Sequence, residues 1–354
     1  MPYDIPARWT RSGVILPRAV SGPGSSIVGD PSVVWDEEIG AWRMFCVMAP
    51  PGHGQAVSRG QDAGPGQWRA LGPLAFLNPE ALAGGEAEKP FIVVDAEHPN
   101  RAARVDGRFW LLIVSPGAGG KVVQRAWSEH LAGPWNIEPG ALIPPGAPDA
   151  FDAKHTDAPT GLYFAGRREF LYFYMGYPRL PQPRSGSPLG SAQGVAVQRL
   201  GESEVQKRGV VLPPAAEPGH WAAGWVGGLH PVPGRRHRWI AVVNASPTPP
   251  DPADQSISRE EPPPSLGGFA VCDAEWPIDG WRWCPEPLEW IADIDPRAVA
   301  AGEGGNLWRH HLLALSDGRL AVLYNSGAYG DEQIYMKVSS DPVGTPGPAP
   351  AAAG

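Results

Sequence analysis

Three acidic residues stand where a carboxyl group could take part in catalysis. Asp30 lies directly before Pro31 at the start of an apolar segment, and Asp157 lies in the segment His155-Thr156-Asp157-Ala158-Pro159. Glu332 precedes the last apolar segment. Carboxyl groups that face one another can divide the roles of proton donor and proton acceptor. The alternative is that the aspartates accept hydrogen bonds from turn N–H groups and that Glu332 is a solvated side chain.

Basic and aromatic side chains accompany these acids at the starts of other apolar segments. Guanidinium and imidazole groups bind hydroxyl or anionic groups, and an indole ring can stack on the face of a sugar ring. The combination therefore suits a carbohydrate ligand. The candidates for contacting it are Arg101, His155, Trp221, Trp225, Trp308, Arg309 and His310. The alternatives are a buried structural imidazole for the histidines and core packing for the tryptophans.

Signatures of several other chemistries are missing from the sequence. No Gly-x-Ser-x-Gly elbow occurs, Cys46 lies inside an apolar segment, and the glycines of residues 117–121 fall on a predicted hairpin turn. The formal net charge is −8 without a long basic run, so nucleic acid is not an expected partner. The three cysteines have no Cys-x-x-Cys spacing, which predicts neither a disulfide framework nor a cysteine metal site.

The elements that must position these side chains recur along the chain. With 45 Gly and 43 Pro among 354 residues, long helices are not expected, whereas 15 Trp predict an aromatic core. One pattern returns five times: a short apolar strand, a strongly aromatic strand, and a third strand. The three strands are expected at 30–35, 38–49 and 55–60; at 101–105, 106–116 and 121–135; at 160–164, 167–178 and 193–200; at 225–232, 236–246 and 267–276; and at 309–315, 317–327 and 332–340.

Such repeats predict an all-β fold, a five-bladed β-propeller of four-stranded antiparallel blades around a central pocket. Residues 8–16 are expected to supply a strand that closes the ring with the last blade. Residues 1–340 are expected to form this single domain, and residues 341–354 a disordered Pro/Ala/Gly tail. The Pro- and Ser-rich residues 178–192 and 246–266 are expected to be long loops on one rim. A β-sandwich or two smaller β domains is the alternative.

Three motifs carry a family resemblance. Asp30-Pro31 opens the first innermost strand, Ala126-Trp127-Ser128 is followed by Leu131-Ala132-Gly133-Pro134-Trp135, and Tyr324-Asn325-Ser326-Gly327 is followed by Gly330-Asp331-Glu332-Gln333-Ile334. Together they resemble the five-bladed propeller glycosidases, glycoside hydrolase families 43, 32, 68, 117 and 130, of which the chain looks like a divergent member.

The resemblance implies a role for each candidate. Asp30 matches the general base, and Asp157 stands near the general acid, although the family carries a Glu there and Asp157 is one methylene shorter. Glu332 is a further catalytic candidate. No acid matches the family's middle carboxylate, and Arg101 at this place would favour anionic groups. No cofactor is required, and a central calcium ion or a phosphate is the ion that the resemblance implies.

The leading hypothesis is an enzyme that cleaves a glycosidic bond of a small glycan or glycoconjugate by carboxylate acid/base catalysis. Phosphorolysis, as in family 130, and a sugar-binding or biosynthetic propeller without hydrolysis are the alternatives. No signal peptide or membrane span is recognised, so a cytoplasmic location without a membrane partner is expected. The Ala-, Gly-, Pro- and Arg-rich composition suggests a bacterial gene.

Overall fold

In the part of the chain that the structure describes, the regular elements are β-strands and two short 3-10 helices, η1 (Arg18–Ser21) and η2 (Pro79–Ala81). The computed structural model describes residues 3–21, 27–49, 52–58, 68–117, 119–179, 190–217, 219–247, 265–290, 303–304, 307–328 and 331–343. Within these ranges no helix has the length and apolar character that a membrane crossing would need. The all-β prediction is confirmed, as expected for a chain punctuated so often by Gly and Pro.

Strand pairing divides the described strands into five antiparallel units of four strands. The first unit is β2 (Ile27–Asp36), β3 (Ala41–Ala49), β4 (Gly52–Ser58) and β5 (Trp68–Pro73). The second is β6 (Glu88–Ile92), β8 (Phe109–Gly117), β9 (Gly120–Ser128) and β10 (Asn136–Ile137). The third is β11 (His155–Phe164), β12 (Glu169–Tyr177), β13 (Ala192–Arg199) and β14 (Gln206–Leu212), and β7 (Val94–Asp95) adds to its inner edge.

The last two units complete the arrangement. The fourth is β15 (Trp225–Pro233), β16 (Trp239–Ser246), β17 (Leu266–Cys272) and β18 (Arg282–Pro287). The fifth is β19 (Leu307–Ala314), β20 (Leu320–Ala328) and β21 (Asp331–Ser339), with β1 (Trp9–Leu16) as its outer strand. The prediction that residues 8–16 would pair with the last unit is therefore confirmed.

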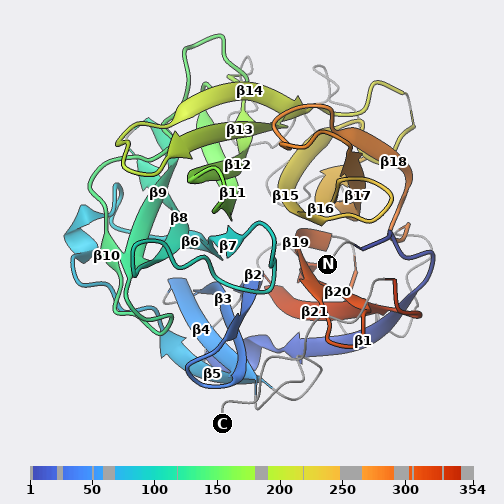
Figure 1. Ribbon diagram of the computed structural model, residues 1–354, viewed down its shortest axis with the longest axis horizontal. Helices are drawn as coiled ribbons and strands as arrows, with labels where there is room; N and C mark the ends of the chain where they lie inside the picture. The colour runs from blue at the N-terminus through green and yellow to red at the C-terminus, as the bar shows by residue number, and fades with distance from the viewer. Residues whose placement is uncertain are drawn as a thin grey trace.

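The five units stand around a common centre (Figure 1). Their first strands β2, β6, β11, β15 and β19 lie nearest the centre, and the outer strands β5, β10, β14, β18 and β1 lie at the periphery. A parallel contact between Ile27 of β2 and Glu332 of β21 links the first unit to the last. This arrangement brings the starts of first strands from all parts of the chain to one end of the centre.

The second unit differs from the prediction, which placed its first strand at residues 101–105. That position belongs to β6, where Phe91 and Ile92 are buried and pair with β8. Residues 101–105 follow β7 and make isolated bridges only. The physical reason is apolarity: the run from Phe91 to Val94 is fully buried, whereas residues 101–105 carry Arg101 and Arg104 on the surface.

The predicted tail and loops lie mostly outside the described residues, namely 344–354, 180–189 and 248–264. Residues 341–343 of the predicted tail are described and held by backbone hydrogen bonds. The Val343 N–H donates to the Gly318 carbonyl, and the Asp4 N–H donates to the Val343 carbonyl. Residues 341–343 are therefore ordered in this structure, and the rest of the predicted tail lies outside the described residues.

Aromatic side chains anchor the second strand of four units. Trp42, Phe109, Phe170 and Trp239 stand at or next to the first residue of β3, β8, β12 and β16, and each is less than 10% exposed. A buried aromatic ring removes a large apolar area from water, so truncation to Ala at such a site typically costs about 3–5 kcal/mol. The regular recurrence of these residues is what made the repeat visible in the sequence.

A β-bulge interrupts the first strand of every unit at the same place. The two residues that face a single partner residue are Asp30-Pro31 in β2, Lys89-Pro90 in β6, Ala158-Pro159 in β11, Gly227-Gly228 in β15 and Arg309-His310 in β19. In four of the five, the first bulge residue is a non-glycine residue with φ between 45° and 53°. L-residues rarely adopt this left-handed conformation, and its repetition at one end of the centre marks a candidate functional region.

Side chains just beyond the bulges tie neighbouring first strands together. The Ser32 hydroxyl accepts from the Ile92 N–H, the Thr160 hydroxyl donates to the Leu229 carbonyl at 2.5 Å, and His230 Nδ1 accepts from the Leu312 N–H at 2.8 Å. All three side chains are buried. These bonds hold adjacent units in register, and so they fix the relative positions of the bulges.

Thr160→Val is expected to lower the free energy of unfolding by about 1–3 kcal/mol, because it keeps the side-chain shape but removes the hydroxyl that serves the buried Leu229 carbonyl. Urea unfolding should show a lower midpoint with an unchanged slope. Thr10→Val, which removes an exposed hydroxyl near Ser340, is the matched control and should change stability by less than about 0.5 kcal/mol. Equal effects of the two variants would contradict the proposed role.

Candidate active site

Charged side chains from three bulges meet at one end of the centre. Asp30, Lys89 and Arg309 come from the bulges of β2, β6 and β19, and the residues directly before the bulges of β6 and β11 add Glu88 and Asp157. The charges of the other four groups all act on the Asp30 carboxyl. Three carboxyl groups and two cations are thus collected from segments up to 280 positions apart, as the prediction required of Asp30 and Asp157.

Asp157 forms a tight ion pair with Lys89. Lys89 Nζ lies 2.8 Å from Oδ1 and 2.7 Å from Oδ2, and the Ala158 N–H donates to Oδ1 at 2.6 Å. The Asp157 side chain is 2% exposed and that of Lys89 is 23% exposed. Burial raises the pKa of Asp157, but the charges of Lys89 and Lys121 outweigh it and hold this pKa well below the usual range. Asp157 is therefore ionised at neutral pH.

Asp30 experiences the opposite environment. Burial raises its pKa above the usual value, and the positive charges of Lys89 and Arg309 oppose this shift without cancelling it. Lys89 is hydrogen-bonded to Asp157 and not to Asp30, which explains why it favours ionisation of one carboxyl more than the other. Two carboxyl groups whose pKa values are moved apart are the usual arrangement of an acid and its ionised partner.

The pKa directions of the two aspartates are opposite to those that the roles implied by the resemblance would need. Asp157 was expected to be the acid or to tune it, yet it carries the lowered pKa and its oxygens are saturated with donors. Asp30 was expected to be the base, yet its pKa is raised. The cause is Lys89, a cation that the sequence prediction did not include in the site.

Glu332 lies behind Asp30 and acts through an asparagine. The Asp30 N–H donates to Asn325 Oδ1 at 3.2 Å, and Asn325 Nδ2 donates to a Glu332 carboxylate oxygen. Glu332 is only 6% exposed. A Cβ at Gly29 would clash with the Asn325 side chain, so this glycine lets the asparagine approach the bulge. The contacts assign Glu332 to positioning the Asp30 backbone.

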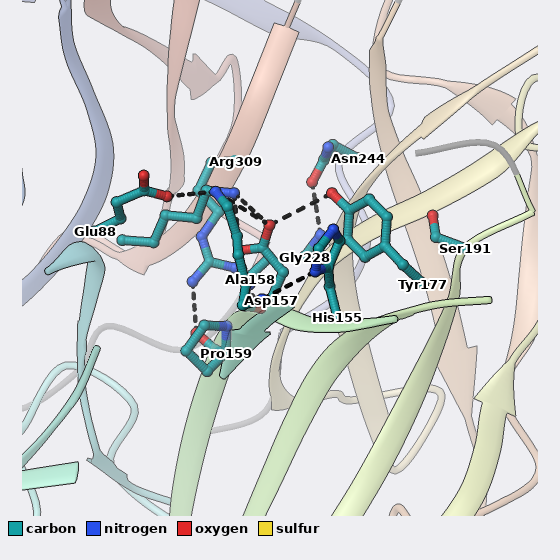
Figure 2. Close-up of polar contacts among 12 residues, drawn as sticks. Glu88, His155, Asp157, Ala158, Pro159, Tyr177, Ser191, Gly228, Asn244 and Arg309 are labelled. Carbon is teal, nitrogen blue, oxygen red and sulfur yellow. Dashed lines mark hydrogen bonds and ion pairs between the residues drawn. The ribbon is translucent and has the colours of Figure 1, made fainter. Parts of the chain in front are cut away.

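Arg309 fills the centre beneath the carboxyl groups. Its guanidinium donates to the Ala158 carbonyl at 2.6 Å and to the Pro159 carbonyl at 2.5 Å, and its side chain is buried. A Cβ at Gly228 would clash with this guanidinium, which explains the absence of a side chain at the bulge of β15. Arg309 reaches across that gap from the fifth unit to the third (Figure 2).

The residues at the centre do not fit the predicted calcium ion. Calcium takes six to eight oxygen ligands, and backbone carbonyls are among its usual donors. Here two central carbonyl oxygens already accept from Arg309, whose guanidinium supplies the positive charge. In the described part of the chain no group of three or more His, Cys, Asp and Glu side chains is suited to hold a metal ion.

His155 joins the site as predicted. Its Nδ1 accepts from the Lys121 N–H at 2.9 Å, and its ring packs edge-on against Tyr177. The Tyr177 hydroxyl lies 3.4 Å from Asp157 Oδ2, and Lys121 Nζ pairs with Glu88. Burial and the charges of nearby lysines lower the pKa of His155 to about 4, so the imidazole is neutral at neutral pH.

Two of the predicted tryptophans stack beside the site. The Trp225 and Trp308 rings are 5.4 Å apart and 16° from parallel, and they pack with Ala158 and Met175. Trp225 is fully buried, so it supports its neighbour and offers no face to a sugar. Trp308 directly precedes Arg309 and is partly exposed, so it is the tryptophan of the pair that can contact a ligand.

Arg101 lies away from the site. It makes a bridge with Trp35 near the end of β2, five positions beyond Asp30, which corresponds to roughly 16 Å along the strand. Its side chain is half exposed and pairs with Glu37. The prediction was wrong because residues 101–105 follow β7, at the opposite end of the first strands.

Trp221 and His310 also point elsewhere. Trp221 is fully buried outside the centre, where its indole N–H donates to the Cys284 carbonyl at 2.9 Å. His310 is the second residue of its bulge and packs against the Tyr324 ring, and burial lowers its pKa to about 3. Both are structural residues, in agreement with the alternative that the sequence left open.

Lys89 and Lys121 are the charged residues that sequence reasoning missed. Lys89 precedes Pro90 as Asp30 precedes Pro31 and Ala158 precedes Pro159, so a shared residue-Pro pair marks three of the five bulges. That pattern was the available signal for the true first strand of the second unit. Lys121 is the second residue of β9, the strand that pairs with β8, and no comparable sequence pattern marks it as a site residue.

A cavity of about 490 Å³ lies elsewhere in the molecule. It is lined by the turns that follow β11 and β15, with Phe164, Arg167 and Trp239 among its residues. These turns are at the ends of the first strands that lie opposite the bulges. None of Asp30, Glu88 and Asp157 is among the residues that line it.

Comparison with solved structures shows the same fold in glycoside hydrolases. A structure described as a glycoside hydrolase matches with a TM-score of 0.65 at 13% identity, over 96% of this chain and 94% of the other. The catalytic domain of a GH62 α-L-arabinofuranosidase from Coprinopsis cinerea matches with a TM-score of 0.59 at 11% identity, over 96% and 98%. An endo-arabinase from Bacteroides thetaiotaomicron matches with a TM-score of 0.58 at 12% identity, over 94% and 99%.

The sequence comparisons add no relative. No protein-family profile matches the chain, and no curated protein matches it. The structural likeness spans nearly the whole of this chain and of its neighbours, so the expected resemblance to propeller glycosidases is confirmed at the level of the fold.

Proposed function

We propose that the five units are the blades of a five-bladed propeller and that the chain is a glycoside hydrolase-like enzyme acting on a small glycan or glycoconjugate. The observation that carries the proposal is the set of three carboxyl groups gathered at the bulges of a fold shared with glycoside hydrolases, among which the pKa of Asp30 is raised and that of Asp157 is lowered. Glycosidic bond cleavage by acid/base catalysis needs one protonated and one ionised carboxyl group.

In the proposed reaction Asp30 is the proton donor. Its proton passes to the glycosidic oxygen while the bond between that oxygen and the sugar carbon breaks. A water molecule attacks the carbon, and an ionised carboxylate accepts the proton that the water loses. Proton exchange with solvent then restores both groups. The raised pKa of Asp30 supports the donor role.

Glu88 is the best-placed acceptor for the water proton. Its side chain is 35% exposed and makes one ion pair, with Lys121, so it keeps free lone pairs. Asp157 is less suited, because Lys89 and the Ala158 N–H already occupy its oxygens and a carboxylate with a strongly lowered pKa is a weak base. Asp157 instead holds Lys89 and contributes negative charge beside the developing cationic sugar.

Hydrolysis of aryl glycosides, tested with and without inorganic phosphate, is the experiment that examines this function. Phosphate-independent release of the aryl alcohol supports hydrolysis. Release that requires phosphate and yields a sugar phosphate supports the phosphorylase alternative. Binding of glycans without turnover of any substrate supports the non-hydrolytic alternative, and both of these outcomes contradict the proposed reaction.

The pH dependence of kcat/KM follows from the role of Asp30. Because its pKa is raised above the usual value, the protonated form persists at higher pH than for an ordinary aspartate, and the rate is expected to fall tenfold per pH unit once the pH exceeds that pKa. Measured with a substrate of poor leaving ability, the profile should have a basic limb that Asp30→Asn removes. A rate that keeps rising with pH would contradict a proton-donating Asp30.

A further inference from the structure

Positive charge accumulates on the His155 side of the candidate active site. The largest charge effects on this imidazole come from the cations of Lys154, Lys121 and Lys89 and from the anion of Asp157. Glu88 pairs with Lys121, so three cations face two carboxylates on this side of the site and leave an excess of one positive charge, in a chain whose formal net charge is −8.

His155 adds a hydrogen-bond donor of fixed orientation. Because Nδ1 accepts from the Lys121 N–H, the proton of the neutral ring resides on Nε2. In the part of the chain that the structure describes, Nε2 has no protein partner. The ring is held by its edge-on contact with Tyr177, 5.3 Å between centroids, and Figure 2 shows both rings beside Asp157.

The side chain of Lys121, whose backbone N–H binds His155, is partly accessible. It is 31% exposed, and its only described acidic partners are Glu88, which is 35% exposed, and Asp157 at 4.0 Å. A part-buried ion pair with both partners about one third exposed can rearrange when a ligand enters. Oxyanions are bound by combinations of ammonium groups and neutral N–H donors of this kind.

We infer that the substrate carries an acidic group, a sugar carboxylate, and that His155 Nε2 and Lys121 form the subsite that receives its oxyanion. This inference rests on the proposed function and names its substrate class. Glu88, released from Lys121 by the entering carboxylate, is then free to act on water. Inorganic phosphate has the same oxyanion chemistry and is the other source that the subsite could accept.

Calorimetric titration of the full chain tests the inference without requiring turnover. The probes are methyl galacturonoside and methyl glucuronoside, their neutral counterparts methyl galactoside and methyl glucoside, and inorganic phosphate. We expect at least one acidic glycoside to bind about tenfold or more tightly than its neutral counterpart, with affinity that falls as salt rises. Phosphate binding without uronoside binding would support the subsite with phosphate as its ligand, and competition between them would support a shared site.

Lys121→Met should weaken acidic-ligand binding about tenfold and neutral-ligand binding less than twofold, and Lys121→Arg should retain most of the affinity. Arg236→Met is the charge-matched control, because Arg236 is 84% exposed and lies in the turn between β15 and β16. Equal binding of acidic and neutral ligands, or no selective loss in Lys121→Met, would overturn the inference. Hydrolysis of neutral glycosides alone would support the proposed function and contradict the acidic subsite. Uronoside binding without hydrolysis would support the subsite and contradict the proposed function.

Discussion

Asp30→Asn is expected to lower kcat/KM for glycosides with poor leaving groups by about 10²–10⁴-fold, the usual contribution of a general acid. The same variant should unfold at an equal or higher temperature at neutral pH. A carboxyl whose pKa is raised in the folded state stabilises the fold only at low pH, and this contribution is lost as the pH rises through the raised pKa. The neutral amide avoids that loss while keeping the shape of the side chain.

The matched control for this variant is Asp106→Asn. Asp106 also has a positive φ, 49°, but lies in the turn before β8 and is exposed. Its substitution should leave both turnover and the unfolding temperature unchanged. Loss of turnover in Asp30→Asn together with a fall of many degrees in the unfolding temperature would indicate that Asp30 is a structural residue, contrary to the proposed role.

Lys89→Met is expected to lower the free energy of unfolding at neutral pH by about 3–5 kcal/mol, the range observed when one partner of a buried ion pair is removed. The reason is that Asp157, 2% exposed, is left as a buried charge without its main partner. Denaturant unfolding measures the effect. As the pH falls toward the lowered pKa of Asp157, the ion pair is lost in the native protein too, and the difference between native protein and variant should shrink.

The double variant Lys89→Met/Asp157→Asn supplies the test of the cause. With the buried charge removed, most of the lost stability should return, which gives a coupling free energy of several kcal/mol. Arg319→Met, which breaks the exposed pair with Asp317, should cost less than about 1 kcal/mol. A double variant as unstable as the sum of its single variants would show that Lys89 and Asp157 do not interact in solution.

Much of the fold was predictable because apolar alternation and aromatic anchors recur. Four of the five expected first strands overlap β2, β11, β15 and β19, and β1 pairs with the last unit as expected for residues 8–16. The prediction of the second unit's first strand was wrong because two apolar stretches precede β8. The stretch from Phe91 to Val94 carries no charged side chain and is the one that is buried. Local pattern does not decide between two candidates for one position in a sheet.

The candidate site was predicted in part, for a related reason. Asp30 and Asp157 were found because the starts of first strands converge, and this holds whatever the side chains are. Arg101 was misplaced together with the strand that was thought to carry it. The pKa directions were beyond the sequence, because they depend on which carboxyl Lys89 reaches, a matter of distances near 2.7 Å between residues 68 positions apart.

The dependence of hydrolysis on leaving-group ability in Asp30→Asn tests the central claim most directly. Dinitrophenolate is a weak base and leaves the sugar carbon without receiving a proton. Methoxyphenolate is a stronger base, so its departure needs a proton donor. If Asp30 is the proton donor, the variant should keep most of its bond-cleaving rate on the first substrate and lose about 10²–10⁴-fold on the second. Equal losses on both substrates would contradict the account and return Asp30 to the role of base.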